Sequence, residues 1–540
     1  MNQVQKISLM TIKHRIELAN MLIQDWSNSN TYVGIGGQLP YLDVDDDLIP
    51  VPNNSVDYIN SIYRNLVALK KITAADMTFI VPRVDWKNGI VYDQYDNRID
   101  MFSTIKLVTA NGTVNVSNSI SLVGNSTKFF SQFSPGDFIY LPGDGEVVAP
   151  QVRQVISITS NTSLNVNTAF TGNFISNTPY LYTDTTPNYS KNFYVRNSYD
   201  QVFICLFNNG GAFSTQMPQI SLGGDLPEDV VILTSDGYQW KYLYSIPSGQ
   251  KQLFFSPDWM PVFKEEDVVS ASVSGRIDVV LIEAAGSGYN GNIPSNSATI
   301  LTVVGDGAGA NLTAVVDSNG SITGVNILNG GSGYTSANVV ITTGTTGSGA
   351  KLRPIISPTG GHGFDPINEL GATGMMLSME LSETEGGTIP TGASVGTGTF
   401  NYRQISIIKN PLTSIGNVAS NVNYSTVTTI TVQPLPAGQF FSIDETVYQG
   451  ISLSESTFSG TVVFWDDVNN VLWLNNIGGE FTPQSPIVGT QQTVPVTAFI
   501  ATGPEIELYT GLVLHINNVL PVIRGADQTE QIRVIFNFLK

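Results

Sequence analysis

The sequence predicts a mainly β, multidomain fold with two amphipathic helices in an α+β N-terminal part and small inserted β-barrel or sandwich modules. Three observations support this fold class. Apolar residues recur at three- and four-residue spacing, as on one face of a helix, only near the N-terminus. After Thr78, short apolar runs alternate with clusters of Gly, Asn, Asp and Pro as far as the C-terminus. A Gly-rich internal repeat occupies roughly Gly275 to Pro358.

The two expected helices run from Thr11 to Trp26 and from Val56 to Lys71. Asn54-Ser55 precedes the second helix and is typical of a helix start. Lys70-Lys71 would lie at its C-terminal end, where positive charges interact favourably with the helix dipole. The segment between the helices, Gly34 to Asn53, is expected to be an ordered loop. The apolar stripes are Ile12, Ile16, Ala19, Leu22 and Ile23 in the first helix, and Val56, Ile59, Ile62, Tyr63, Leu66 and Leu69 in the second.

Two β-hairpins are expected from their turns. Asn88-Gly89 lies between two apolar runs, and both residues tolerate the positive φ that a tight hairpin turn requires. Ser235-Asp236-Gly237 precedes the run Tyr238 to Tyr242 in the same way.

The internal repeat aligns Gly286-Ser287-Gly288-Tyr289 with Gly331-Ser332-Gly333-Tyr334. Each copy reads as strand, Gly-rich corner, strand, second Gly-rich corner and strand. A single copy could not bury its apolar face, so we expect the two copies to pack as one paired β module.

Two further β segments, Lys106 to Thr183 and Val427 to Phe499, look inserted into other domains. Each is expected to form a small barrel or sandwich. Because loop insertions cost little closure entropy, we expect such modules to leave the host core intact and to project outward.

The composition disfavours several kinds of partner. The formal net charge of −19 is unsuited to gripping phosphate backbones, so neither nucleic acid nor an anionic membrane is an expected partner. Charged residues make up only 13% of the chain, well below the usual share, so Ser, Thr, Asn and Gln must cover much of the surface. Such a surface suits an assembly component, although a secreted adhesin would share it. No signal peptide or membrane-spanning segment is recognisable, and the single cysteine, Cys205, lies in an apolar strand.

No catalytic, cofactor-binding or metal-binding residue is predicted. Gly305 to Gly309 is followed by a strand and not by the helix that a phosphate-binding loop needs. The acidic run Asp43 to Asp47 lacks the Gly and Glu of a calcium loop, and Asp93, Asp96 and Asp100 are expected to be surface carboxylates. Three histidines, His14, His362 and His515, leave little for a metal site or a catalytic triad. The Gly392-Ala393-Ser394-Val395-Gly396 pattern lacks the helix that a nucleophile elbow needs, and the loop Gly360 to Pro366 is expected to be a structural turn or an interface loop.

Several long blocks, colinear along the chain, resemble one protein family. They are Ser55 to Asp96, Lys191 to Val262, Lys351 to Ala372, Phe400 to Pro411 and Asn517 to Phe538. These blocks resemble the baseplate wedge protein of large contractile-tailed, T4-like bacteriophages, the wedge subunit encoded by gene eight. They span somewhat under half the chain, and the two inserted β segments have no counterpart in the smaller members of the family. The segment between Arg98 and Tyr189 separates the first two of these blocks, and we expect those two blocks to come together in one domain.

The resemblance implies a non-enzymatic structural subunit of a virion, located in the tail baseplate and assembled in the host cytoplasm. It implies a homodimer that links neighbouring wedge proteins to peripheral proteins bearing fibres or spikes, and that moves as a rigid body when the baseplate opens. It implies no cofactor. An alternative remains open: a tail-associated protein that binds or depolymerises host glycans, for which the Gly-rich repeat and the acidic balance would also be suitable.

Large aromatic and basic residues in the resembling blocks are candidate contact residues, because such side chains dominate protein interfaces. For each one, burial in the chain's own core is an open alternative. The candidates are Trp86, Tyr92, Tyr95, Trp240, Tyr242, Trp259, His362, Arg524 and Arg533. The expected division of the chain is 1–104 (helices and start of the core), 105–183 (first insert), 184–265 (core), 266–358 (repeat), 359–426 (core), 427–499 (second insert) and 500–540 (final core strands).

Overall fold

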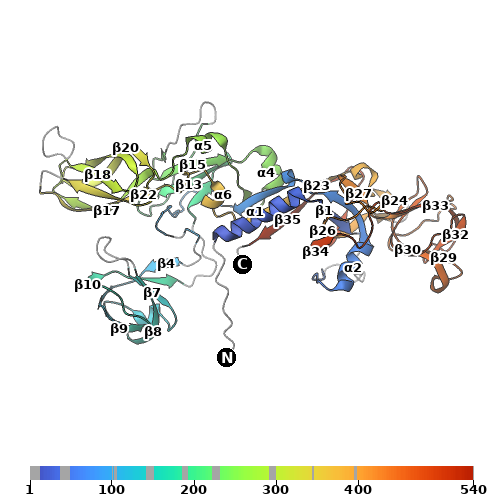
Figure 1. Ribbon diagram of the computed structural model, residues 1–540, viewed down its shortest axis with the longest axis horizontal. Coiled ribbons are helices and arrows are strands. Elements are labelled where there is room, and N and C mark those ends of the chain that lie inside the picture. The colour runs from blue at the N-terminus through green and yellow to red at the C-terminus, as the bar shows by residue number, and fades with distance from the viewer. Residues whose placement is uncertain are drawn as a thin grey trace. The chain divides into compact units, whose positions relative to one another are not determined.

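The protein is described by a computed structural model, and the fold is mainly β, as predicted (Figure 1). The structure describes residues 12–36, 49–99, 101–102, 106–141, 151–184, 192–221, 231–290, 299–342, 346–394 and 398–538. The chain folds into two compact units. Unit 1 comprises Met1–Arg83, Ile246–Phe263 and Pro366–Lys540, and unit 2 comprises Val84–Ser245 and Lys264–Asp365. The finer division into seven segments stays a prediction.

Unit 1 is built from two sheets and a closed barrel. The sheets have the strand orders β27-β2-β1-β26-β34 and β16-β3-β23-β35, and the barrel has the order β28-β31-β30-β29-β32-β33. Its elements are α1 (Ile12–Asn28), β1 (Thr31–Gly36), α2 (Val56–Asn65), β2 (Leu66–Lys71), η1 (Ala74–Asp76), β3 (Met77–Pro82), α4 (Ser248–Phe254), β16 (Trp259–Pro261), α6 (Pro366–Glu369), β23 (Gly374–Ser382), η2 (Glu385–Gly387), β24 (Ala393–Ser394), β25 (Gly398–Thr399), β26 (Asn401–Lys409), β27 (Asn423–Ser425), β28 (Thr428–Val432), β29 (Thr446–Gly450), η3 (Leu453–Glu455), β30 (Ser456–Asp466), β31 (Val471–Gly479), β32 (Ser485–Gly489), β33 (Val496–Thr502), β34 (Leu512–Ile523) and β35 (Thr529–Asn537).

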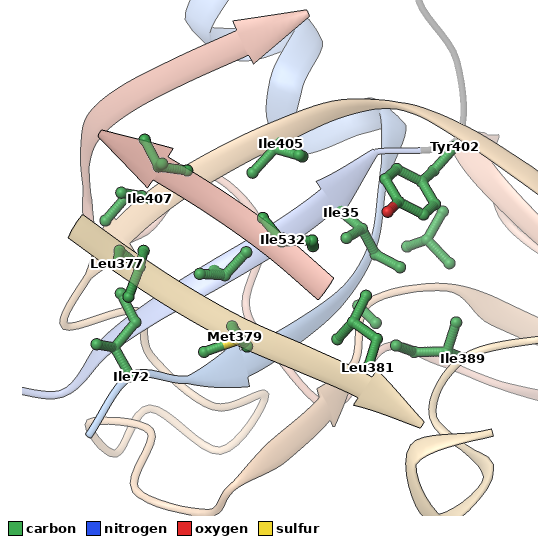
Figure 2. Packing of buried hydrophobic residues seen from close by; sticks show 14 of the residues in the cluster. Ile35, Ile72, Leu377, Met379, Leu381, Ile389, Tyr402, Ile405, Ile407 and Ile532 are labelled. Carbon is green, nitrogen blue, oxygen red and sulfur yellow. The ribbon is translucent and has the colours of Figure 1, made fainter. Parts of the chain in front are cut away.

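The main core of unit 1 lies between its two sheets. Leu377, Met379 and Leu381 project from alternate positions of β23, and Ile405 and Ile407 of β26 belong to the same buried cluster (Figure 2). This alternation follows from the two-residue period of a strand, which sends successive side chains to opposite faces. The opposite face of β23 is also covered, since Met376 packs with Phe254 of α4.

The first predicted helix is confirmed as α1, whose buried stripe includes Ile16 and Ala19. The second helix is shorter than predicted. It begins after Ser55, whose hydroxyl caps it by accepting a hydrogen bond from the Tyr58 amide, but it ends at Asn65. Leu66–Lys71 forms the strand β2 between β1 and β27, so Lys70-Lys71 does not end a helix. The expected loop from Gly34 is likewise wrong at its start, because Gly34 lies within β1.

Unit 2 holds a four-stranded core sheet, the first inserted segment and the repeat. The core sheet has the order β12-β13-β15-β14. The elements are β4 (Lys106–Thr109), β5 (Thr113–Ser117), β6 (Ser121–Asn125), α3 (Phe129–Gln132), β7 (Phe138–Leu141), β8 (Gln151–Ser160), β9 (Ser163–Val166), β10 (Asn173–Thr178), β11 (Leu181–Asp184), β12 (Tyr194–Arg196), β13 (Gln201–Phe207), β14 (Val231–Leu233), β15 (Gln239–Ser245), α5 (Glu266–Ala271), β17 (Ile277–Ser287), β18 (Ile300–Gly305), β19 (Ala308–Val316), β20 (Ile322–Ser332), β21 (Ala337–Thr342) and β22 (Ser348–Ile356).

The interrupted block rejoins across the core sheet. The Trp86 amide donates to the Arg196 carbonyl oxygen at 2.9 Å, and the Arg196 amide donates to the Val84 carbonyl oxygen at 2.8 Å. The Tyr95 amide donates to the Cys205 carbonyl oxygen at 2.7 Å. Residues on either side of the first insert therefore share one domain.

This pairing corrects one hairpin prediction. Asn88-Gly89 does form a turn, with φ of 79° at Gly89, but its flanking runs do not pair with each other. Ile90 instead forms an isolated bridge with Ser214, and Asp85 forms one with Arg196, so both flanks pair with partners that are distant in the sequence. The hairpin at Ser235-Asp236-Gly237 is confirmed, since β14 pairs with β15 across that turn.

The repeat folds as one module through strand exchange. The first strand of each copy pairs with the last strand of the other copy, β17 with β22 and β20 with β19. The middle strands β18 and β21 pair with each other. The equivalent tyrosines repeat the exchange, because the Tyr289 hydroxyl accepts from the Ala350 amide and the Tyr334 hydroxyl from the Ala310 amide. The predicted pairing of the two copies is confirmed.

The two inserted segments differ in how they relate to the rest of their units. Strands β4 to β11 form one eight-stranded sheet around a cluster drawn entirely from residues 110–182. The barrel β28 to β33 has a cluster of its own, yet Val427 and Val463 belong to the main core of unit 1. The expectation of an intact host core therefore fails for the barrel, which supplies part of that core.

Candidate functional site

Most of the candidate contact residues in unit 2 lie inside one aromatic cluster. Tyr92 and Trp240 are buried with their rings 5.6 Å apart, and Tyr242 packs edge-on against Phe203. Trp86 lies at the margin of the cluster, half-buried, and its indole nitrogen donates to the Ser214 hydroxyl at 3.0 Å. Tyr92, Trp240 and Tyr242 are thus covered by the chain itself and act as core residues.

Hydrogen bonds fix the buried tyrosine hydroxyls. The Tyr242 hydroxyl donates to a Glu265 carboxylate oxygen at 2.5 Å, and the Tyr92 hydroxyl accepts from the Lys87 amide at 2.6 Å. Burial raises the pKa of Tyr242 far above its ordinary value, and Glu265 adds to this shift. Burial also raises the pKa of Tyr92. Both hydroxyls therefore stay protonated and serve as structural ties.

His362 lies in a tight glycine loop. Its side chain is 2% exposed and its ring meets the half-buried Tyr95 ring edge-on at 4.9 Å. Gly361 has φ of 97°, and a Cβ atom there would lie 2.5 Å from the Val273 nitrogen. The expectation that this loop is structural agrees with its close packing, and His362 belongs to the core and not to an accessible contact surface.

In unit 1, Arg524 is buried and the other two candidates are accessible. The Arg524 guanidinium contacts a Glu530 carboxylate oxygen at 2.9 Å and donates to the Glu383 carbonyl oxygen at 2.9 Å. Arg533 donates to the carbonyl oxygens of Gln252 and Phe255, at the C-terminal end of α4, where a cation complements the helix dipole. Trp259 is half-buried against the cluster that covers α4.

One open groove gathers polar side chains in unit 2. It has a volume of about 540 Å³ and is lined by Asp93, Asp96, Phe207, Asn208 and Glu283, among others. Arg353 is paired with two of the three carboxylates, Asp96 at 2.9 Å and Glu283 at 2.6 Å. The groove therefore keeps an excess of negative charge, because one guanidinium is shared by two of its three carboxylates, and those two are not free to act as the opposed pair that glycoside hydrolysis uses.

Sequence reasoning missed Arg353 and Glu283 as groove residues. Their only signal is that they are charged residues in strands that otherwise carry few charges. Asp236 was also missed as a tie between loops. It accepts hydrogen bonds from the amides of Thr215, Gln216 and Tyr238 and from the Thr234 hydroxyl. Burial alone would raise the pKa of Asp236, but these donors hold it below its ordinary value.

The remaining motifs show no reactive arrangement in the described part of the chain. Gly305 to Gly309 spans the end of β18, the turn at 306–307 and the start of β19, and Asp306 in the turn accepts hydrogen bonds from the amides of Thr335 and Ser336. The Thr335 hydroxyl and these amides lower the pKa of Asp306. Ser394 ends the two-residue strand β24, and the residues that follow it, 395–397, lie outside the described residues, as do Asp43 to Asp47 and Asp100.

The described residues contain neither a candidate metal-ion cluster nor a candidate membrane-spanning helix. Where the structure describes the chain, no three His, Cys, Asp or Glu side chains gather closely enough to hold a metal ion. None of the helices in those ranges has the length and apolar character required to cross a bilayer.

Comparison with known proteins gave no identification. The chain matches no protein-family model and no curated protein.

Proposed function

We propose that this chain is a non-enzymatic structural subunit of a phage tail baseplate wedge. The proposal comes from the colinear blocks that resemble the wedge family. One structural observation supports it most directly: blocks far apart in the sequence pair with one another. Trp259 of β16 pairs with Pro82 of β3, and Gln404 of β26 pairs with Asn518 of β34.

The modules attach to these sheets in a way that suits a scaffold. The first insert begins and ends on paired strands, with Lys106 opposite Asp184. The repeat does the same, with Ile277 opposite Ile356, and so does the barrel, with Thr429 opposite Thr502. Each module therefore begins and ends at neighbouring positions in space. Because of this, the positions of the flanking blocks in space do not depend on the size of the module. A structural subunit can acquire such modules without altering its central contacts.

The proposed partners are a second copy of the chain, the neighbouring wedge proteins and peripheral proteins that carry fibres or spikes. A sparsely charged surface rich in hydroxyl and amide groups is compatible with wet, polar subunit contacts. The subunit is expected to move as a rigid body when the baseplate opens.

Assembly provides the test. The purified chain should scatter light as a dimer, and on co-expression with neighbouring wedge proteins it should enter wedge intermediates isolated by sedimentation. Mass spectrometry of purified tails should detect it. A monomer that never enters those intermediates and is absent from tails would overturn the proposal.

The glycan alternative is favoured by one observation, the groove that holds Asp93, Asp96 and Glu283. Its volume is within the range of ligand sites, but Arg353 pairs with two of its three carboxylates. Incubation with host surface polysaccharide discriminates between the two functions. Release of reducing ends that is lost in Asp93→Asn would support the glycan function, whereas no release and no binding would reject it.

A further inference from the structure

The C-terminal part of unit 1 has a one-sided charge pattern. Between Lys409 and Arg524 the sequence contains no Lys or Arg, and it contains eight carboxylates. They are Asp444, Glu445, Glu455, Asp466, Asp467, Glu480, Glu505 and Glu507. The whole barrel β28 to β33 lies in this stretch, so its side chains include acids but no Lys or Arg.

One end of the barrel also exposes aliphatic side chains. We call this end, residues 450–457 and 477–484, the barrel tip; it surrounds the start of β30. Ile451 is 93% exposed there, Leu453 44% and Ile477 38%. Glu455 and Glu480 are exposed beside them and are the tip's only charged residues. The two segments of the tip thus expose aliphatic groups together with two carboxylates, a combination that suits a contact surface.

The tip is held rigidly, which distinguishes it from a loop that is exposed by chance. Buried Gln449 donates to the Thr482 carbonyl oxygen at 3.0 Å and accepts from the Thr482 amide at 2.9 Å. The Glu480 amide donates to the Thr457 carbonyl oxygen at 2.9 Å, and the rings of Phe458 and Phe481 pack at 5.5 Å. These contacts anchor both ends of the loop that carries Ile451 and the segment opposite it, which limits the backbone entropy that the tip would lose on binding.

We infer that the barrel tip docks onto a protein partner that has an apolar depression for Ile451 and Lys or Arg residues around it. Charge complementarity selects this occupant: basic side chains would pair with Glu455 and Glu480. A tip-to-tip contact with a second copy would bring like charges together. Nucleic acid and anionic lipid would be repelled by the same carboxylates. The inference rests on the proposed function, in which such a partner is another protein of the same tail.

Binding measurements with matched variants test the inference. The probes are the other structural proteins of the same tail, purified singly, and binding to the full chain is measured by calorimetry. We expect one of them to bind, and Ile451→Ser to weaken its affinity about tenfold. The double variant Glu455→Gln/Glu480→Gln should bind more weakly than the wild type. Its affinity should also change much less than the wild-type affinity between about 0.05 M and about 0.3 M salt. Val468→Ser is the control, because Val468 is 83% exposed in the turn at the opposite end of β30.

Hydrogen exchange in intact tails gives an independent readout. The barrel tip should be protected in tails relative to the free chain, while the turn at Val468 should not. The docking inference is wrong, and the structural function stands, if the chain is present in tails but its tip is unprotected and Ile451→Ser changes the affinity for no tail protein. If the chain is absent from tails, the structural function fails and the docking inference fails with it. Tip-dependent binding to a second copy, or to anionic vesicles or DNA, would also overturn the assigned partner.

Discussion

Arg524 is a buried cation whose contacts explain why an apparent interface residue is structural. Its side chain is fully buried and lies 2.9 Å from Glu530, which is itself 9% exposed. We expect Arg524→Leu to destabilise unit 1 by about 3–5 kcal/mol, because it leaves a buried carboxylate without its partner. Burial already raises the pKa of Glu530 even with Arg524 beside it, so the site disfavours an unpaired carboxylate. Urea unfolding followed by circular dichroism measures the loss.

A second variant separates the charge effect from simple loss of packing. Arg524→Leu/Glu530→Leu should recover much of the stability, because it leaves no unpaired charge. Lys409→Leu breaks a surface pair with Asp25 and should cost less than about 1 kcal/mol. The single variants Arg524→Leu and Glu530→Leu are measured alongside. If the loss of stability in the double variant equals the sum of the losses in these two, this account is contradicted.

Asp236 makes the stability of unit 2 depend on pH. Its pKa is lower in the folded chain than its ordinary value of 3.8, because hydroxyl and amide donors stabilise the carboxylate. Such a carboxyl stabilises the fold above its ordinary pKa, and this contribution is lost as the pH falls through the folded pKa. We expect Asp236→Asn to cost about 1–2 kcal/mol at neutral pH. The gap between the two proteins should close as the pH falls below 3.8.

The measurement is denaturant unfolding at several pH values, followed by tryptophan fluorescence, to which buried Trp240 of unit 2 contributes. Asp467→Asn makes the same change in charge at an exposed position and is the control. A gap between wild type and Asp236→Asn that stays constant from neutral pH to pH values below 3.8 would show that the carboxylate charge does not matter.

Gly361 is required by both its backbone angle and its surroundings. We expect Gly361→Ala to destabilise unit 2 by about 1–3 kcal/mol, because its φ is 97° and a Cβ would meet the Val273 backbone. Gly249→Ala is the matched change, since Gly249 lies in α4 with open space around its Cβ. That variant should gain about 0.5–1 kcal/mol. Thermal unfolding of both proteins compares them, and equal effects would refute the steric argument.

Local patterns predicted elements well where one period was unambiguous. α1 and the strands of the repeat follow directly from apolar spacing and from Gly-rich corners. Leu66 to Lys71 could not be assigned in this way, because its Leu and Ala residues are good helix formers and continue the stripe of α2. Burial between β1 and β27 overrides this propensity, and Leu66, Val67, Ala68 and Leu69 are all buried. The strand is chosen by partners that are distant in the sequence.

The same limit applies to turns and to the candidate contact residues. A local turn at Asn88-Gly89 was predictable, but the partners of its flanks, Arg196 and Ser214, lie beyond the insert. Tyr92 and Trp240 were chosen because they are aromatic, but the sequence could not show whether their side chains are buried or exposed. Residue type alone cannot distinguish a core aromatic from a contact aromatic, because both maximise apolar contact. The barrel tip was missed because Ile451 is one of many aliphatic residues until its exposure is known.

The two inserted segments look alike in sequence but make different contributions to the molecule. The first has a core of its own, whereas the barrel shares Val463 with the main core of unit 1 and ties to α2 through Asn475, whose side chain donates to the Asn65 carbonyl oxygen. A module whose two ends are paired neighbours is therefore not necessarily independent of its host. The distinction depends on which side chains cross the boundary, and the chain's linear order does not reveal that.

Excision of each segment tests this difference. Replacing Leu107 to Thr183 by a short Gly-rich link should leave the rest of the chain folded, because Lys106 and Asp184 are paired neighbours and the cluster of the first insert would be removed whole. Replacing Ile430 to Ala501 in the same way joins another paired site, but it removes Val463 from the main core. Losing a buried aliphatic side chain costs about 1–3 kcal/mol by itself, and the exposed core around Tyr402 adds to this. We therefore expect the first deletion to keep the urea midpoint of its host, unit 2, within error, and the second deletion to lower the midpoint of unit 1 clearly or prevent its folding. A barrel deletion that leaves the midpoint of unit 1 unchanged would mean that the barrel is as separable as the first insert, contrary to the shared core.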